Sequence, residues 1–342
     1  MYTHVSLFAG LGGFIMAAKR NNIQTVFANE IEPSCCTVLN YNFRNETFIS
    51  SQDLRKLRAN DYAELAQDID ILSAGFPCQS FSQAGENLGF DDERGKLFFE
   101  IPRLCEEMDH YPKILLLENV PFLKIFDSGS RLRTVINELR RIGYWISDVN
   151  TEILDSYNFG VTPQKRERLF MVATHSHYFR KNKFVFPKPE NVAKPVELWS
   201  IVDRTSRGDE FLYLDTENKY ARMIARVADE HGRDRLFQVR RTEVRACPIG
   251  VCPTLTANMG AGGHNVPFVI DDFGIRRLSV REMLRLQCIN PSEFRFPMGL
   301  TENAALTMIG NALCIDLVDL LFQNIRDMLS EVYNDKSDLG IS

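Results

Sequence analysis

An uninterrupted apolar run, Ile114 to Leu117, is the feature that most constrains how this chain can fold. It has the length of a strand but lacks the polar alternation of a strand with one face in water, so both of its faces must be buried. That is the situation of a central strand in a parallel sheet covered by helices. Apolar runs at 5–8, 24–28, 69–73 and 169–173 alternate with helical segments. The sequence therefore predicts an α/β protein with a Rossmann-like, doubly wound sheet.

Length and composition are those of an ordinary globular protein. The chain has 342 residues, of which 44% are hydrophobic and 25% charged, enough for one large domain and a smaller one. Met1 to Phe8 already has the pattern of a strand, and no apolar run is long enough to cross a bilayer, so we expect a cytoplasmic protein without a membrane partner. The eight cysteines are expected to be reduced thiols, and their spacing predicts no metal site.

Cys78 is a candidate nucleophile. It follows the apolar run 69–73 through Ala74-Gly75-Phe76-Pro77, and the restricted backbone around a proline is expected to hold the thiol at the rim of the sheet. A cysteine after an apolar strand is also often a small buried hydrophobe, and the local sequence leaves this alternative open. The stretch 80–95, rich in serine, glycine and charge, is expected to be a long loop that closes over substrate.

A glycine turn, Ala9-Gly10-Leu11-Gly12-Gly13, joins the first strand to a helix. Glycines let the backbone approach a ligand, and the helix N-terminus presents free N–H groups, so the turn suits a nucleotide-like molecule or is plain structure. Glu30, after the next strand, would accept hydrogen bonds from ribose hydroxyls; alternatively it caps the helix that starts at Pro33. Asp53 would accept from an adenine-type amino group, or is a solvated turn residue.

Charged residues also flank two of the apolar runs. Glu118 directly follows the run 114–117, where partial burial would suit a general acid. A structural ion pair with an arginine is the alternative. Arg166 and Arg168 precede the run 169–173 two residues apart, so we expect both side chains on one face, holding a carboxylate, a phosphate or a base carbonyl.

The sequence changes in character after about residue 178. Prolines mark a linker, and the stretch 204–245 is rich in arginine although the formal net charge of the chain is −5. An excess of arginine over lysine favours contact with phosphates and base edges; a solvated charged face is the alternative. Beyond it, 276–287 is expected to be a strand end running into a helix, and 308–312 is expected to open the final helix.

Six segments, in this order, resemble the motifs of the cytosine-5 DNA methyltransferases: Phe8 to Gly13, Gly75 to Gln79, Glu118 to Val120, Gln164 to Arg168, Arg277 to Glu282 and Gly310 to Ala312. They span nearly the whole chain outside about 180–250. The resemblance implies a methyltransferase sheet in a catalytic domain, 1–178, completed by a C-terminal helix, 303–332. It also implies a mostly irregular or β target-recognition domain, 179–302, where the arginine-rich stretch lies.

The same resemblance implies S-adenosyl-L-methionine as methyl donor and a cytosine flipped out of duplex DNA as target. Cys78 would add to cytosine C6, Glu118 would act on N3, and Arg166 and Arg168 would hold the base and Glu118. The donor site would be lined by Phe8, Gly10, Gly12, Gly13, Phe14, Glu30, Asp53, Leu54, Pro77, Leu97 and Asn311. Residues on the DNA side would be Gln79, Asn119, Gln164, Thr254, Leu255, Arg240 and Arg241. Ile31 stands where relatives often carry a large aromatic residue against the adenine.

We therefore expect the modification enzyme of a restriction-modification system, a monomer acting on double-stranded DNA. A cognate restriction endonuclease would act independently. Two other functions stay open: a tRNA cytosine-5 methyltransferase, and a non-catalytic DNA-binding protein on the same scaffold. The arginine-rich stretch favours DNA over tRNA, and the presence of Cys78, Glu118 and Arg168 favours catalysis.

Overall fold

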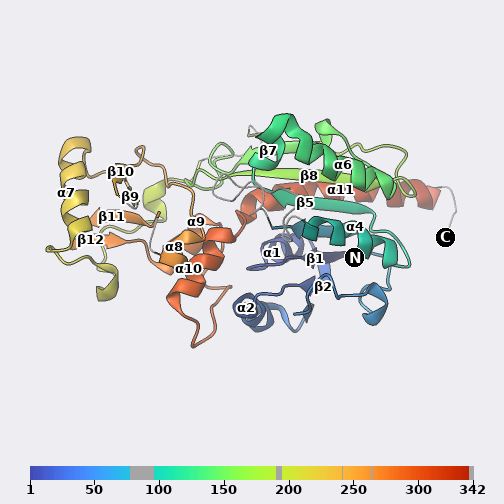
Figure 1. The fold of residues 1–342 in the computed structure, drawn as a ribbon, viewed down its shortest axis with the longest axis horizontal. Helices are drawn as coiled ribbons and strands as arrows, with labels where there is room; N and C mark the ends of the chain where they lie inside the picture. The colour runs from blue at the N-terminus through green and yellow to red at the C-terminus, as the bar shows by residue number, and fades with distance from the viewer. Residues whose placement is uncertain (78–95, 190–194, 241, 263–264, 339–342) are drawn as a thin grey trace. The chain divides into compact units, whose positions relative to one another are not determined.

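The computed structural model describes residues 1–77, 96–189, 195–240, 242–262 and 265–338. The chain divides into two compact units, which can be followed by colour in Figure 1. The first unit contains Met1–Leu154, Glu167–Pro187 and Val318–Ser342, and the second contains Asp155–Arg166 and Lys188–Leu317. The chain thus leaves the first unit, enters it again for one strand, and returns to it for its last helix.

The first unit is built on a mixed sheet with the strand order β3-β2-β1-β4-β5-β8-β6, and β7 also pairs with β8. β1 is parallel to β2 and β4, β4 is parallel to β5, and β8 is antiparallel to β5 and β6. The α/β prediction is therefore confirmed. The strands are β1 Tyr2–Leu7, β2 Ile23–Asn29, β3 Phe48–Ser50, β4 Ile71–Gly75, β5 Ile114–Asn119, β6 Tyr144–Trp145, β7 Thr151–Asp155 and β8 Glu167–His175.

The direction of winding reverses between β1 and β4. The chain adds β2 and β3 on one side of β1, then β4 and β5 on the other. Open sheets of this kind bind ligands outside the carboxyl ends of their strands at such a reversal. Register pairs Leu7 with Ala74, Gly75 with Glu118 and Asn119 with Leu169, so the ends of β1, β4 and β5 and the start of β8 lie along one edge.

Burial explains why β5 lies inside this sheet. Residues Ile114 to Leu117 are all 0% exposed, as expected from an apolar run with no alternation. Its neighbours differ in direction, because β4 is parallel to it and β8 antiparallel. The predicted buried strand is confirmed, whereas the expected fully parallel surroundings are wrong on the β8 side.

Helices flank the sheet, and η denotes a 3₁₀ helix. In α11, Phe322 packs edge-on against the His4 ring of β1 with 5.4 Å between ring centroids, which fastens this last helix to the centre of the sheet. Among the described residues, no single helix is long and apolar enough to cross a membrane. The helices are α1 Gly13–Arg20, α2 Pro33–Phe43, η1 Ala59–Asp61, η4 Leu97–Phe99, α4 Glu100–Glu107, α5 Phe122–Ile125, η5 Phe126–Gly129, α6 Ser130–Arg141, η6 Asp148–Asn150 and α11 Ile315–Asp338.

Two expected elements are wrong. The pattern at 144–154 predicts one strand, but a 3₁₀ turn separates β6 from β7, because Ser147 and Asn150 form a reciprocal capping box. The segment 308–312 does not open the final helix. It ends α10 (Glu302–Asn311), since Ala312 leaves the helix with extended backbone, and α11 begins at Ile315.

The second unit contains a four-stranded antiparallel sheet in the order β10-β9-β11-β12. The prediction of a mostly irregular or β region is therefore confirmed. That prediction does not include the 13-residue helix α7. The expected strand-to-helix passage at 276–287 is confirmed by β12 and α9. The elements are η8 Leu198–Ser200, η9 Glu210–Leu212, α7 Lys219–His231, β9 Phe237–Val239, β10 Val244–Ala246, α8 Asn258–Gly262, β11 Pro267–Asp271, β12 Gly274–Arg277, α9 Val280–Leu286 and α10.

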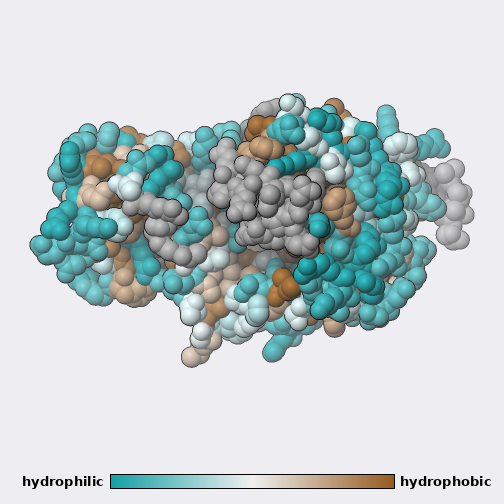
Figure 2. All heavy atoms as spheres, viewed as in Figure 1, coloured by the Kyte–Doolittle hydropathy of each residue, from teal (hydrophilic) through white to brown (hydrophobic). Residues whose placement is uncertain are grey.

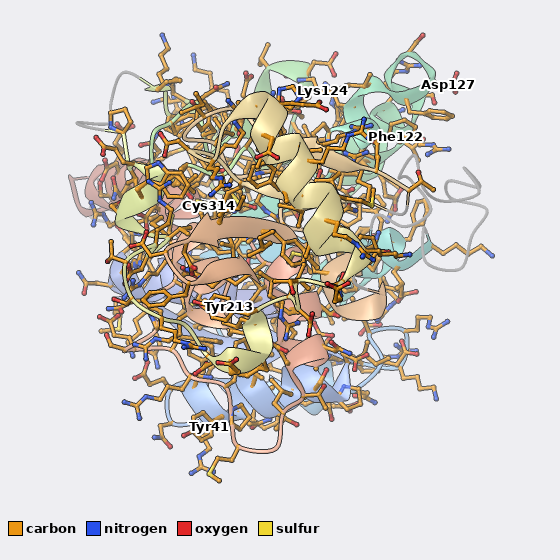
Figure 3. The ribbon with its side chains drawn as sticks, turned by 90° about the vertical axis from the view of Figure 1, so that its left-hand side faces the viewer. Tyr41, Phe122, Lys124, Asp127, Tyr213 and Cys314 are labelled. Carbon is orange, nitrogen blue, oxygen red and sulfur yellow. The ribbon has the colours of Figure 1, made fainter. Side chains whose placement is uncertain are left out.

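A buried charge cluster ties this small sheet to α9. Arg276 Nε lies 2.7 Å from Asp271 Oδ2, and Arg276 Nη2 lies 2.9 Å from Glu282 Oε1. The hydroxyl of Tyr213, labelled in Figure 3, donates to Asp271 at 2.9 Å. Glu282 also accepts from Ser279 N at 2.7 Å and so caps the helix. Buried charges that satisfy one another in this way specify one arrangement of strand and helix.

His4 is a buried polar residue in the middle of β1. It is 0% exposed, and its ring nitrogens lie 2.8 Å from Thr25 Oγ1 and 2.7 Å from Ser73 Oγ. These contacts join β1 to β2 and β4 in the interior of the sheet. Burial lowers the pKa of His4 to about 3, so the ring is neutral in the folded protein at neutral pH.

We expect stability to fall as the pH drops below about 6.5, because the unfolded chain then binds a proton that folded His4 refuses. The stability that neutral His4 contributes is fully present above the unfolded pKa. At pH 5 the free energy of unfolding is lower by about 2 kcal/mol. Urea unfolding at pH 7.5 and pH 5 measures it. The variant His4→Gln should lose that part of the pH dependence, whereas exposed His110→Gln should keep it. Equal pH dependence in all three proteins would contradict this expectation.

Candidate active site

The carboxyl edge of the first sheet gathers several residues expected to be functional. β1 runs into the glycine turn, β4 ends at Gly75 and leads to Pro77, and β5 ends with Glu118 and Asn119. Cys78 and Gln79 follow directly but lie outside the described residues, as do Arg241 and the expected loop 80–95. Parallel strands thus deliver residues distant in sequence to one edge.

Glu118 and Arg168 form an ion pair at this edge. Arg168 Nε lies 2.9 Å from Glu118 Oε1, and their side chains are 17% and 13% exposed. Glu118 faces Phe170 in the register, so Arg168, two residues earlier on β8, lies on the same face as Glu118. An added Cβ at Gly75 would lie 3.2 Å from Glu118 Oε2, which explains why the neighbouring strand ends in glycine.

Asn119 fixes the turn that precedes Cys78. Its side chain is 1% exposed, and its Nδ2 donates to Phe76 O at 3.1 Å while its Oδ1 accepts from Val120 N at 2.9 Å. The end of β5 therefore holds the end of β4 through an amide side chain. Further along, Lys124 of α5, labelled in Figure 3, donates to Thr151 O at 2.7 Å and fastens the segment after β5.

The glycine turn adopts backbone that only glycine takes without strain. Gly10 and Gly12 have φ of +55° and +87°, and a Cβ at Gly12 would lie 2.6 Å from the Phe43 ring. Within the described part of the chain, and apart from its two chain neighbours, no atom lies within 4 Å of the Cβ position at Gly10, so open space adjoins the turn there. Phe8 also has a positive φ, +52°, which marks a strained backbone at the end of β1.

Glu30 connects the glycine turn to β2. Its Oε2 accepts from Gly10 N at 2.8 Å, and its Oε1 accepts from Ile31 N and Glu32 N at 2.8 and 2.9 Å. These main-chain donors aim the carboxylate; Oε1 already accepts two hydrogen bonds, and Oε2 keeps a further lone pair for a ligand hydroxyl. The fixed carboxylate beside the open space at Gly10 fits a ribose-bearing donor. Glu30 also precedes α2, as the helix-capping alternative requires.

The remaining residues expected at the donor site are variously placed. Asp53 accepts from Arg55 Nη2 at 2.6 Å, and this hydrogen bond lowers the pKa of the Asp53 carboxyl. Its carboxylate would therefore have to bind an adenine while remaining in contact with Arg55. Ile31 is 57% exposed, so its side chain is open to a ligand. Gly13 and Phe14 begin the buried face of α1, Leu54 is 3% exposed in the core, and Pro77 and Leu97 are half-buried.

Arg166 binds different partners from Arg168. It is 1% exposed; its Nη1 donates to Leu255 O at 2.8 Å, and its Nη2 donates to Gly310 O at 3.0 Å and Ala312 O at 2.5 Å. β8 begins at Glu167, so the alternation of a strand does not extend to Arg166. The expectation that both arginines share one face therefore does not fit their contacts. Arg166 holds main-chain carbonyls in the second unit.

Gln164 extends this buried polar group, which we call the carbonyl hub: Gln164, Arg166 and Gln287 with the carbonyls they bind. Gln164 Oε1 accepts from Leu255 N at 2.9 Å, and its Nε2 donates to Leu286 O at 3.0 Å. Gln287 Nε2 donates to Ile309 O at 2.8 Å. Gln164 and Leu255 are both 0% exposed, so these two residues expected at DNA are buried in the protein. Sequence reasoning missed Gln287; a polar residue at the end of an apolar helix was its only signal.

Thr254 and Asn311 remain accessible beside the carbonyl hub. Thr254 is half-buried and donates from Oγ1 to Lys165 O at 2.6 Å, and Asn311, at the end of α10, is exposed. Between them the backbones touch, because a Cβ at Gly310 would lie 2.1 Å from Thr256 C and 2.3 Å from Ala257 N. The segment expected to approach DNA therefore packs directly on the segment expected to bind the donor.

Among the described residues, no group of three or more His, Cys, Asp or Glu side chains could hold a metal ion. The fold is Rossmann-like, and Glu30 with the glycine turn at the edge of its sheet fits a ribose-bearing cofactor. The model of the C-5 cytosine-specific DNA methylase family matches residues 2–327. The chain belongs to that family.

Curated relatives support this assignment, and solved structures share the fold. Type II methyltransferase M.Bsp6I of Bacillus sp. is 34% identical over 322 residues, which cover 94% of this chain and 97% of the relative. Type II methyltransferase M.NgoBI of Neisseria gonorrhoeae is 31% identical, with 93% and 91% covered. The structure of Spodoptera frugiperda DNMT2 superposes with a TM-score of 0.71 at 17% identity, with 95% of this chain and 99% of that chain covered. That of a putative DNA modification methyltransferase encoded within an E. coli prophage gives 0.66 at 20%, with 96% and 100% covered.

The family assignment makes this chain a DNA (cytosine-5-)methyltransferase. It also implies the use of S-adenosyl-L-methionine, because methylases of this family depend on that donor.

Gly310→Ala tests the close packing beside the carbonyl hub. In a free helix alanine is favoured over glycine, but here its methyl group must displace the backbone at Thr256 and Ala257. We expect destabilisation of about 1–3 kcal/mol, measured by thermal unfolding. Gly208→Ala is the matched control, because its Cβ would meet its nearest atoms at an ordinary 3.5 Å. A Gly310→Ala protein as stable as the control would show that the contact is not tight.

Proposed function

We propose that this enzyme methylates C5 of a cytosine flipped out of a specific duplex DNA sequence, through a covalent bond between Cys78 and C6. The observation that carries the proposal is the Glu118–Arg168 pair at the sheet edge, directly beside the turn that leads to Cys78. A base must leave the stack for its ring to be attacked, so flipping accompanies the chemistry.

The other cysteines support Cys78 by elimination. Burial raises the pKa of the Cys35, Cys36, Cys105, Cys247 and Cys252 thiols, which makes them poor nucleophiles. Cys288 and Cys314 face each other with their Sγ atoms 3.3 Å apart, inside the second unit. Cys78 comes three residues after the end of β4, whose last residue, Gly75, pairs with Glu118.

Cys78 would act as the nucleophile and Glu118 as the general acid. The Cys78 thiolate adds to C6, and the displaced electron pair moves toward N3, where the Glu118 carboxyl supplies a proton. C5 thereby becomes nucleophilic enough to take up a methyl group. Loss of the C5 proton to water, departure of the thiolate and return of the N3 proton to Glu118 then restore the aromatic ring. Arg168 orients Glu118 from 2.9 Å, and the N–H groups that it uses for neither Glu118 nor Glu167 O would hold the base.

S-adenosyl-L-methionine would be held by Glu30 and the glycine turn. When bound it supplies an electrophilic methyl group on a positively charged sulfur. The Glu30 carboxylate, aimed by three main-chain N–H groups, would accept from the ribose hydroxyls. Phe8, Phe14, Asp53, Leu54, Pro77, Leu97 and Asn311 would complete the site, with Ile31 giving weaker stacking on the adenine than an aromatic residue.

The type II relatives favour a role as the modification enzyme of a restriction-modification system, with any cognate endonuclease acting separately. On the DNA side, Asn119, Gln164 and Leu255 would act as positioning residues, because all three are buried. The Asn119 and Gln164 side chains bond main-chain groups, and the Leu255 main chain is bonded by the Gln164 and Arg166 side chains. Arg166 would act in the same way by holding the segments of Leu255 and Gly310. Gln79, Thr254, Arg240 and Arg241 are the remaining candidates for contact with DNA.

Cys78→Ser should abolish methyl transfer to duplex DNA while leaving DNA affinity within a few fold. The hydroxyl is far less ionised than a thiol at neutral pH, so attack at C6 fails. Transfer of labelled methyl groups and filter binding measure the two properties, and tRNA serves as the second acceptor. Substantial methylation by the variant would overturn the covalent mechanism. Methylation of tRNA in preference to DNA by the unchanged protein would overturn the choice of substrate.

Arg168→Lys should lower kcat by about 10- to 1,000-fold with little change in donor affinity, because a lysine cannot hold Glu118 and the base with one planar fork. Arg141→Lys is the matched control, since Arg141 is an exposed arginine bonded to Glu106 and Glu138 on the surface. Single-turnover methylation gives the rate of the chemical step. If both variants retain the parent rate, the Glu118–Arg168 pair has no part in the chemistry.

A further inference from the structure

The arginine-rich stretch of the second unit is less basic than its sequence suggests. Six of its arginines lie within 4 Å of a carboxylate: Arg204 pairs with Asp234, Arg207 with Glu210, Arg222 with Glu217, Arg226 with Glu230, Arg233 with Asp229 and Arg245 with Glu243. A phosphate would have to compete with each of these acids. The stretch as a whole is therefore a poor phosphate-binding surface.

Helix α7 illustrates this most clearly. It packs against β10 through Ala221, Ile224 and Ala228, and hydrophilic side chains predominate on the surface around it (Figure 2). Its exposed Arg226 is paired with Glu230 one turn further on, at i and i+4. Such alternation is typical of a solvated helix face, so α7 offers no consistent attraction to DNA.

Arg240 is different. Among the described residues no carboxylate pairs with it; its Nε and Nη2 both point to Gln238 Oε1 at 3.4 Å. It lies in the connection between β9 and β10, where its N–H donates to Glu243 O at 2.8 Å and closes the turn. Arg235, the other described arginine of the stretch without a carboxylate, instead directs Nη1 to Cys247 O. Arg240 thus combines an uncompensated charge with a side-chain amide that orients it.

The geometry leaves one edge of the Arg240 guanidinium for a ligand. Nε and Nη2 form the side fork that faces Gln238, so the end fork of Nη1 and Nη2 remains. Gln238 lies on β9, is 8% exposed and is held between β10 and β11, and its amide oxygen accepts from the Arg240 side chain just beyond the end of the strand. A two-stranded ribbon fits the major groove, and an arginine end fork matches O6 and N7 of guanine.

Resting on the proposed function, we propose that Arg240, oriented by Gln238, reads one guanine of the recognition sequence in the major groove, and that the arginines of α7 do not contribute to recognition. Arg240 is then a specificity-determining residue. Gln238 is a positioning residue that acts through it. Specificity at this one base pair depends on the Nη1 and Nη2 end fork of Arg240. The arginines that are paired with carboxylates do not change the affinity for other sequences.

The test begins with the unchanged protein: bisulfite mapping of DNA from cells that express it gives the recognition sequence. Purified variants are then assayed for methyl transfer on duplexes with each base pair changed singly. Arg240→Ala should lose about 10- to 100-fold in kcat/KM on the mapped site and should lose discrimination at one guanine only. Replacing that guanine by 7-deazaguanine, which lacks the N7 acceptor, should slow the unchanged protein but not Arg240→Ala.

Arg240→Lys and Arg226→Ala are the controls. The lysine keeps the charge but not the fork, so discrimination at the guanine should fall while the salt dependence of binding persists. Arg226→Ala should match the unchanged protein in rate and specificity. Thermal unfolding shows whether each variant is folded. If Arg240→Ala is not folded, Arg240→Lys and the 7-deazaguanine duplex with the unchanged protein still test whether Arg240 reads the guanine.

A uniform loss on all sequences with a shallower salt dependence would make Arg240 a phosphate contact and overturn the proposal. Unchanged discrimination, or loss of specificity in Arg226→Ala, would overturn it too. Failure of the unchanged protein to methylate any DNA would instead refute the proposed function, which separates the two results.

Discussion

The structure depends on one constraint: parallel strands bring their carboxyl ends to one edge. β1, β4 and β5 pair in parallel, so the glycine turn, the approach to Cys78 and Glu118 meet there although they lie far apart in sequence. Antiparallel β8 adds the missing cation, because its start rather than its end reaches this edge, and Arg168 thereby comes to 2.9 Å from Glu118. A purely parallel sheet would have carried that arginine to the opposite edge.

Satisfying buried main-chain groups is the second constraint. Where α10 ends, the carbonyls of Ile309, Gly310 and Ala312 need partners, as helix ends do. Gln287 and Arg166 supply them, and Arg166 also binds Leu255, so one buried guanidinium satisfies both the helix end and the neighbouring loop. Truncating Arg166 would leave several buried carbonyls unpaired at once, and each costs about 1–3 kcal/mol. The two arginines of this motif therefore have different contacts. Arg168 pairs with Glu118 at the sheet edge, whereas Arg166 binds main-chain carbonyls of the second unit.

Apolar runs and strand-end residues are predictable from sequence, because burial and alternation are local properties. β4 and β5 illustrate this. Side-chain partners of turns are less visible. The Ser147–Asn150 capping box interrupts a segment whose pattern predicts one strand, and Ala312 follows the end of a helix at a position where the sequence predicts a helix to begin. The division of labour between Arg166 and Arg168 depends on contacts with residues about 90 and 145 positions away, which no local pattern encodes.

Charge in the second unit makes the same point about recognition. Counting arginines in 204–245 predicts a basic surface, but a formal charge attracts DNA only where no carboxylate already compensates it. The acids that compensate are interspersed among the arginines, so composition alone cannot separate a DNA-binding surface from a solvated helix. Pairing does separate them: Arg226 has Glu230, whereas Arg240 has an amide that orients it without neutralising it. A recognition domain of low net charge can then select a sequence through a few uncompensated side chains, with little attraction to DNA in general.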